Sequence, residues 1–469
     1  MIPITESVNM ERSPPPRMSN ATSSSNPLPP LRCTCGTIPI IDLSSYDQQK
    51  KTDDVNQEGK KEDESWIEST RSSIVSACQS HGCFHLVINT NANNEDEEVI
   101  VKPTNHKKSS LSSLTHLSPS WEFASKNPNE VIGPLFDQKI EEMTQPQRLS
   151  TYRGRNAESG KVGSTLDNGD NEEPKQSWEF RRCHCTSLLK GEEDSTDSTL
   201  CQWTMALHSI AVRLSDILNL PNGMIVRNDD GDGCNSDLLR VFRYDPIDPQ
   251  QPRQDDDEND IALGSSPHTD WGTMTIVWQD GIGGLQMYCH ENDQWYPVVP
   301  PPSSSNDSKH QLHCFVHVGD FLSLSSPPVM SSCSNNRNGH DAVVVEPLWK
   351  SPRHRVVSPT GIKPRYSLVY FLYPRLGMTL RHAQTQMANN GDYFGATIHD
   401  DDPLPMNHRS YPSSVLERYS LLHNQSVVLE PFGGETDNDD SILQTRFQEM
   451  RHVPFEEVVA QKWAQVQRS

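Results

Sequence analysis

Two pairs of polar residues, each with the spacing of a β-strand, constrain this chain more than any other feature of its sequence. His268 and Asp270 are separated by one residue, and Arg365 and Ser367 repeat that spacing later in the chain. Side chains alternate along an extended strand, so residues two apart point to the same side. The spacing therefore predicts two strands of a barrel wall, each of which presents a pair of polar groups to one face.

His354 completes a candidate metal site with the first pair. Two imidazoles and one carboxylate on one face of an octahedral ion bind Fe(II) and leave three positions open, as O2 chemistry requires. A guanidinium holds a carboxylate through two charge-assisted hydrogen bonds, and a nearby hydroxyl can add a third. We interpret His268, Asp270 and His354 as iron ligands, and Arg365 with Ser367 as a carboxylate clamp.

Six short motifs that contain these residues follow one another in a fixed order. They are Ser266–Thr275, Gly283–Gln286, Trp295–Val298, Val318–Phe321, His354–Val357 and Arg365–Phe371. Together they resemble the Fe(II)/2-oxoglutarate-dependent dioxygenases of the isopenicillin N synthase-like family, densely over residues 236 to 375 and more thinly over 37 to 215. Repeated short apolar strands between residues 263 and 373 fit a double-sheet jelly roll. We expect a mostly β fold with flanking helices, in which a double-stranded β-helix (jelly-roll) core follows an N-terminal α/β region and precedes a C-terminal extension.

The resemblance implies a reaction as well as a fold. In the family, 2-oxoglutarate and O2 occupy the open positions on Fe(II), and the cosubstrate leaves as succinate and CO2 while a small-molecule metabolite is hydroxylated or desaturated. Ascorbate serves as an added reductant. The resemblance also implies that the Tyr244 phenol donates to the far carboxylate of 2-oxoglutarate, and it assigns no catalytic residue beyond the metal centre.

Two other functions stay open. An oxidase of the same family uses no 2-oxoglutarate, and its Arg-x-Ser pair binds a carboxylate of the substrate or of an activator. A non-catalytic metal-binding protein would instead recruit partners through its acidic inserts. The motifs do not separate the dioxygenase from the oxidase. The complete ligand set and clamp argue against the third function, because buried polar groups without a metal or anion are costly.

Composition favours one catalytic domain with tails and inserts. Only 33% of the 469 residues are hydrophobic and the mean hydropathy is −0.69, so much of the chain cannot bury enough apolar surface to fold. We expect four parts: a disordered tail at 1–36, an N-terminal non-haem dioxygenase region with low-complexity inserts at 37–235, the catalytic core at 236–375, and a C-terminal extension at 376–469.

Charge and cysteine content restrict the partners and the compartment. The formal net charge of −22 argues against nucleic acid or an anionic membrane as a partner. No apolar stretch approaches the roughly 20 residues of a membrane span, and residues 1–30 lack the pattern of a signal or transit peptide. Eleven irregularly spaced cysteines are typical of reduced thiols, and the clusters at 33–35 and 183–185 have too short a spacing for zinc. We expect a cytoplasmic monomer that acts on a small molecule.

Local patterns predict further elements and several roles for single residues. Strands are expected at 38–43, 81–88 and 238–246, helices at 66–78, 200–218 and from Pro454, and solvated loops at 50–64, 91–129, 248–260, 300–309 and 325–341. His81 and His85 are expected to be partly exposed and His208 to be structural. His317 either lines the pocket or packs, while Arg353 and Arg355 are expected to face solvent or acidic loops.

Overall fold

The structure is a computed structural model that describes the regular parts of the chain. The described residues are 38–43, 59–89, 132–134, 136, 154–155, 175–182, 196–227, 237–246, 261–289, 292–299, 311–326, 328–333, 342–389 and 447–466. The predicted loops at 91–129, 248–260 and 300–309 and both cysteine clusters lie outside these ranges.

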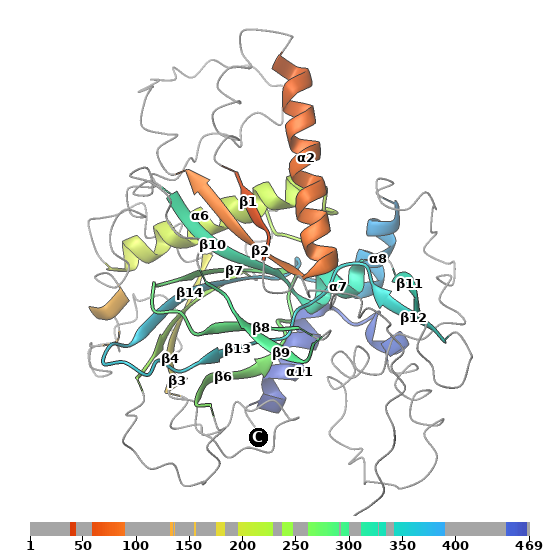
Figure 1. The fold of residues 1–469 in the computed structure, drawn as a ribbon. Coiled ribbons are helices and arrows are strands. Elements are labelled where there is room, and N and C mark those ends of the chain that lie inside the picture. The colour runs from red at the N-terminus through yellow and green to blue at the C-terminus, as the bar shows by residue number, and fades with distance from the viewer. Residues whose placement is uncertain are drawn as a thin grey trace, which may run out of the picture.

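Two β-sheets form the centre of the molecule (Figure 1). The larger has the order β1-β2-β10-β7-β14-β5-β4-β3 and the smaller the order β6-β13-β8-β9. The large sheet consists of β1 (Ile40–Asp42), β2 (Cys83–Asn89), β10 (Gln311–Val318), β7 (Met274–Gln279), β14 (Arg365–Leu372), β5 (Leu238–Tyr244), β4 (Lys175–Arg181) and β3 (Gly154–Arg155). The small sheet consists of β6 (Leu263–His268), β13 (His354–Val357), β8 (Leu285–Cys289) and β9 (Gln294–Pro297). From β5 to β14 the chain passes back and forth between the two sheets.

Strand alternation divides the apolar residues into two cores. One face of the large sheet packs against helices through residues such as Val241, Ile276 and Leu368. The opposite face meets the small sheet through a second cluster that contains Phe242, Phe315 and, from the small sheet, Met287. Polar residues at alternate positions of the large sheet therefore point into the space between the sheets.

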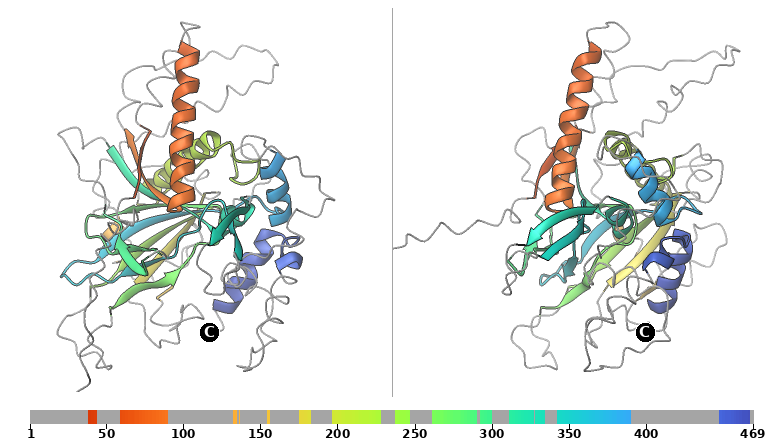
Figure 2. Two further views of the ribbon diagram at one scale, coloured as in Figure 1. Left: turned by 45° about the vertical axis from the view of Figure 1, so that its right-hand side comes forward. Right: turned by 90° about the vertical axis from the view of Figure 1, so that its right-hand side faces the viewer.

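Helices cover the outer face and one end of the large sheet. They are α2 (Gly59–Ser80), α6 (Thr196–Ile217), α7 (Asp320–Ser325), α8 (Leu380–Asn389) and α11 (Phe455–Val466). The apolar stripe of α6, which includes Trp203, Leu207 and Leu214, packs in the core on the helix side of the large sheet. The views of Figures 1 and 2 show the N-terminal half of α2 extending beyond the sheets.

The C-terminal helix predicted from Pro454 is present as α11. The ring of Phe455 lies 4.9 Å from Phe321 of α7 and 5.7 Å from Tyr373, measured between centroids. The backbone N–H of Gly377 donates to the Glu456 carboxylate at 2.9 Å. These contacts attach the helix next to the end of β14.

The main strands and helices lie where the sequence predicts them, and mostly β with flanking helices is confirmed as the fold class. Two predicted loops were wrong. The first turns of α2 occupy 59–64, inside the loop predicted at 50–64. The loop predicted at 325–341 contains β11 (Pro328–Cys333), which pairs with β12 (Ala342–Pro347) in a separate two-stranded sheet. Within the described residues, no helix has both the length and the apolar character that a membrane span needs.

Candidate metal centre

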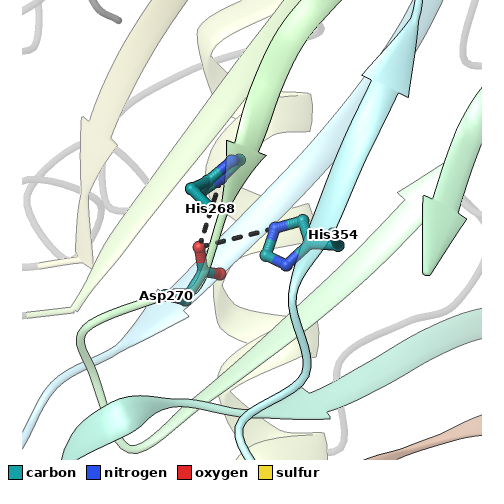
Figure 3. Close-up of side chains that lie close together, drawn as sticks. All are labelled: His268, Asp270 and His354. Atoms are coloured by element: carbon teal, nitrogen blue, oxygen red, sulfur yellow. Dashed lines mark ion pairs between the residues drawn. The ribbon is translucent and has the colours of Figure 1, made fainter. Parts of the chain in front are cut away.

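Three side chains converge between the sheets at the end of β6 and the start of β13 (Figure 3). The Asp270 Oδ1 atom lies 3.6 Å from His268 Nε2 and 3.6 Å from His354 Nε2. One ligand atom from each residue lies within 4.8 Å of the other two. Asp270 and His354 are buried, whereas the His268 side chain is 40% exposed. The cluster is therefore accessible from the His268 side.

Strand pairing brings the two histidines together. His354 is the direct partner of His268 across the β13–β6 ladder, and their rings lie 4.3 Å apart between centroids. Asp270 departs from the prediction, because β6 ends at His268 and Asp270 follows it in a loop. The backbone N–H of Asp320 donates to the Asp270 carbonyl at 2.7 Å, and the Thr269 hydroxyl donates to the Asp320 carboxylate at 2.8 Å. These bonds fix the loop at the start of α7.

The backbone orients both imidazoles. His268 Nδ1 lies 2.7 Å from the Ser266 carbonyl, and His354 Nδ1 lies 3.3 Å from the Pro352 carbonyl. A carbonyl oxygen only accepts, so each Nδ1 carries the proton and each Nε2 presents its lone pair to the cluster. Neutral histidines with Nε2 free are the form that binds a metal ion.

The surroundings of the site favour an ionised Asp270 carboxylate and a neutral His354 imidazole. Burial acts to raise the pKa of Asp270, but His317, His354, His268 and a hydrogen bond from the Thr275 hydroxyl outweigh it, so that pKa is lowered. Burial, reinforced by His268, holds the pKa of His354 well below its usual range. Two imidazole nitrogens and one carboxylate oxygen form a donor set that fits a divalent ion such as Fe(II).

The predicted clamp lies on the large sheet and faces the small one. Arg365 and Ser367 are both on β14 and nearly fully buried. The Arg365 guanidinium donates to Gln279 Oε1 at 3.1 Å and lies 4.8 Å from the centroid of the Tyr244 ring, its partner across the β14–β5 ladder. Arg365 Nε and Nη1 and Ser367 Oγ have no hydrogen-bond partner in the described part of the protein.

Asp280 interacts electrostatically with Arg365 but accepts its hydrogen bonds from the backbone. Its carboxylate accepts the backbone N–H groups of Tyr366 at 2.7 Å and Ile282 at 3.1 Å, and burial is the main cause of its raised pKa. Three buried donors without an acceptor are costly in a folded protein. The Arg365 and Ser367 donors therefore form a site that an external carboxylate would complete.

Sequence reasoning missed two residues of strand β7, Thr275 and Gln279. The Thr275 hydroxyl donates to Asp270 Oδ2 at 2.5 Å, and Gln279 accepts from Arg365. Side chains alternate along a strand, so Thr275, Val277 and Gln279 lie on one face of β7. This spacing could have predicted that Thr275 and Gln279 share a face. Strand β7 thus contacts both the candidate metal ligands, through Thr275, and the clamp, through Gln279.

The structure corrects the expected exposure of His85 and adds detail to the roles predicted for three other residues. His85 is buried and packs edge to face against Phe315, because it lies on β2 inside the sheet and not beside it. Arg353 and Arg355 lie away from the cluster, but each stacks on an aromatic ring of the small sheet, Tyr288 and Trp295 respectively. His208 is structural as predicted, since it belongs to a buried group with Asp237 and Tyr370.

Comparison with known proteins agrees with the site. Residues 236–374 match the model of the 2OG-Fe(II) oxygenase superfamily. The 1-aminocyclopropane-1-carboxylate oxidase homolog 10 of Arabidopsis thaliana is 35% identical over 224 residues, which cover 46% of this chain and 47% of the relative. A 2-oxoglutarate-dependent dioxygenase of Didymella fabae is 28% identical over 142 residues, 30% of this chain and 32% of the relative. The chain thus spans half or less of the length of these relatives.

Solved structures overlap more loosely. The dioxygenase for auxin oxidation 1 from Arabidopsis thaliana, in complex with 2-oxoglutarate, is 16% identical with a TM-score of 0.40, covering 73% of this chain and 94% of that one. A putative oxygenase from Shewanella oneidensis is 15% identical with a TM-score of 0.38, covering 73% and 92%. The fold of this chain is defined by its own strand order, not by these overlaps.

Proposed function

We propose that this protein is an Fe(II)- and 2-oxoglutarate-dependent oxygenase that hydroxylates or desaturates a small molecule and forms succinate and CO2. His268, Asp270 and His354 would hold the iron, and Arg365, Ser367 and Tyr244 would hold the cosubstrate. Residues 236–375 would form the catalytic core, a double-stranded β-helix between an N-terminal region at 37–235 and a C-terminal extension at 376–469. We also propose that the protein is a cytoplasmic monomer.

The observation that carries the proposal is the arrangement along β7. Thr275 contacts the metal cluster and Gln279 contacts the clamp from the same face of the strand. Four residues of extended strand span about 13 Å. That length accommodates the Asp270 carboxylate, an ion, a short dicarboxylate and the Arg365 guanidinium in a row. A five-carbon dicarboxylate such as 2-oxoglutarate has the charge and size to connect the two ends.

Each group in the site has a physical task in this reaction. The iron, with 2-oxoglutarate and O2 bound, would supply the oxidation. His268, Asp270 and His354 would hold the ion and leave coordination positions for the cosubstrate and O2. The Arg365 guanidinium and the Ser367 hydroxyl would hold the far carboxylate of the cosubstrate and so set its orientation. The apolar residues between the sheets, among them Phe242 and Phe315, would exclude water from the site.

Succinate production tests the proposal. The purified protein is incubated with Fe(II), ascorbate, O2 and 2-oxoglutarate, and succinate is measured by mass spectrometry in the absence and presence of a metabolite extract. We expect slow uncoupled formation of succinate that Asp270→Ala abolishes, because this variant lacks one of only three protein ligands. Asp293→Ala, on an exposed turn of the small sheet, is the matched control and should retain the wild-type rate. An Asp270→Ala variant with full activity would refute the iron assignment.

The same assay distinguishes the oxidase alternative. An oxidase consumes O2 with its substrate whether or not 2-oxoglutarate is present, and it forms no succinate. An oxygen electrode trace that depends on the metabolite extract but not on 2-oxoglutarate would replace the proposed reaction with the oxidase. A mass-spectrometric search of the extract for compounds that gain one oxygen atom only with 2-oxoglutarate would identify the substrate.

A further inference from the structure

A third histidine lies next to the candidate metal ligands. His317, on β10, is buried and 2% exposed, and its Nε2 atom lies 3.4 Å from Asp270 Oδ2. Its ring lies 4.6 Å from that of His354 between centroids. The β10–β7 register places His317 directly opposite Thr275, the residue whose hydroxyl bonds the same Asp270 oxygen. Two neighbouring strands therefore direct polar groups at one atom.

The two oxygens of Asp270 have separate surroundings. Oδ1 faces His268 and His354, each at 3.6 Å, whereas Oδ2 faces His317 and Thr275. His317 lies at Oδ2 and the two candidate histidine ligands lie at Oδ1, so His317 would contact the ligating carboxylate without being a ligand itself. Groups in this position hold a ligating carboxylate in one orientation and tune its affinity for the metal.

Packing alone does not explain a histidine here. The ring contacts Phe315 and His354, and both contacts would suit a phenyl ring. A buried imidazole costs more to desolvate than a phenyl ring unless its nitrogens interact with a polar group. The polar group within reach of Nε2 is the outer oxygen of Asp270.

We propose that His317 is a positioning residue of the iron centre, which holds Asp270 Oδ2 together with Thr275 so that Oδ1 is presented to the ion. The inference rests on the proposed function for its metal. Without the His317 nitrogen, the carboxylate can turn about its Cβ–Cγ bond and lose its fixed ligating oxygen. Fe(II) affinity should fall even though all three ligands remain.

A pair of variants separates the nitrogen from the ring. His317→Phe keeps an aromatic ring and removes the nitrogen, whereas His317→Gln keeps an N–H donor and removes the ring. Anaerobic titration with Fe(II), and with Co(II) as a spectroscopic substitute, gives the Kd of each protein without 2-oxoglutarate or turnover. We expect His317→Phe to bind both ions about 10- to 100-fold more weakly, and His317→Gln to retain most of the affinity. The Co(II) absorption spectrum should change only in His317→Phe.

The melting temperature of the metal-free proteins controls for folding. Equal Fe(II) affinity in His317→Phe and wild type would overturn the inference, because the ring would then suffice. Equal losses of affinity in both variants, with lowered melting temperatures, would show a packing role and also overturn it. If His317→Phe does not fold, His317→Met replaces it, since methionine matches glutamine in shape and lacks the donor. A wild-type protein that binds no Fe(II) would instead refute the proposed function.

Discussion

Arg365 is a buried cation whose donors outnumber its acceptors. Gln279 takes one N–H, the Tyr244 ring supports the guanidinium from one side, and Nε and Nη1 have no partner among the described residues. The phenol of Tyr244 was predicted to donate to the cosubstrate, and the structure shows that the ring also contacts the Arg365 guanidinium. A guanidinium in this setting is prepared for an anion that arrives from outside.

Arg365→Lys tests this role. Lysine replaces a planar two-pronged donor with a point charge, so one charge-assisted hydrogen bond is lost, worth about 1.5 to 3 kcal/mol. We expect the KM for 2-oxoglutarate to rise roughly ten- to a hundredfold while the Kd for Fe(II) changes little. The control is Arg355→Lys, an arginine stacked on Trp295 outside the cluster, which should leave KM unchanged. An unchanged KM in Arg365→Lys would remove the cosubstrate from the clamp.

A second buried charge group lies in the core on the helix side of the large sheet. Asp237 is fully buried, and its Oδ2 atom lies 3.2 Å from Arg182 Nε, 3.2 Å from His208 Nδ1 and 3.3 Å from the Tyr370 hydroxyl. Burial is the largest influence on His208 and lowers its pKa, which keeps the imidazole neutral. The group ties β14 and α6 to the start of β5.

Removal of this carboxylate should be strongly destabilising. Asp237→Ala leaves the Arg182 charge buried without its partner, which costs about 3 to 5 kcal/mol in free energy of unfolding. Asp216→Ala removes the carboxylate of the largely exposed pair with Arg227 and should cost about 0 to 1 kcal/mol. Urea denaturation of both variants measures the difference. Similar midpoints for the two would show that the buried group contributes little.

At the scale of elements, the loop that carries Asp270 depends on close contact between backbones. A Cβ at Gly319 would lie 2.2 Å from the Gly272 carbonyl oxygen, and a Cβ at Gly272 would lie 2.4 Å from the Leu372 carbonyl oxygen. Gly319 has an ordinary backbone conformation, with φ of −93°, so the restriction is one of space. The loop that carries Asp270 thus packs directly on the end of β10 and the end of β14.

Gly319→Ala should disturb both stability and metal binding. The added methyl group forces the Asp270 loop away from α7, and overpacking of this kind typically costs about 1 to 3 kcal/mol. We expect a lower melting temperature and a weaker Fe(II) affinity, measured by calorimetry and anaerobic titration. Gly361→Ala is the control, because nothing lies within 4 Å of the position that its added methyl group would occupy. A fully stable Gly319→Ala variant that binds Fe(II) normally would show that the loop can move without cost.

At the scale of the whole molecule, the C-terminal helix α11 is part of the folded core. Phe455 is 3% exposed and contacts Phe321 of α7. The backbone N–H groups of Asp320 and Phe321 donate to carbonyls of the loop that carries Asp270. Residues near the end of the chain are thereby connected through packing to the metal cluster. Helix α11, within the extension proposed at 376–469, thus packs in the same hydrophobic core as the large sheet.

Phe455→Ala tests that connection. Truncation of a buried phenylalanine costs about 3 to 5 kcal/mol. We expect unfolding at a lower denaturant concentration in a single transition with the rest of the domain. Ile362→Ala, at a side chain that is 97% exposed, should change stability by less than about 0.5 kcal/mol. Separate unfolding of α11 before the sheets, seen by fluorescence and circular dichroism, would contradict a single folded body.

The sequence by itself determined the features that depend on local period. Alternation along β14 sufficed to place Arg365 and Ser367 on one face, and the apolar stripe of residues 200–218 sufficed to predict α6. The sequence also predicted the metal ligands, because two histidines and one aspartate suit Fe(II). The structure brings these residues, His268, Asp270 and His354, together.

Only the tertiary structure decided the features that depend on strand pairing and register. His317 meets Asp270 because β10 pairs with β7 at Thr275, and no local pattern contains that pairing. Asp270 lies on a loop, not on a strand, because β6 ends where the chain turns into β7 and the loop binds the start of α7. Residues 328–333 form a strand despite one proline and two serines because β12 supplies the partner, and pairing overrides weak strand propensity. Local sequence sets the direction of a side chain within its element, but the contacts between elements are set by the packing of the whole chain.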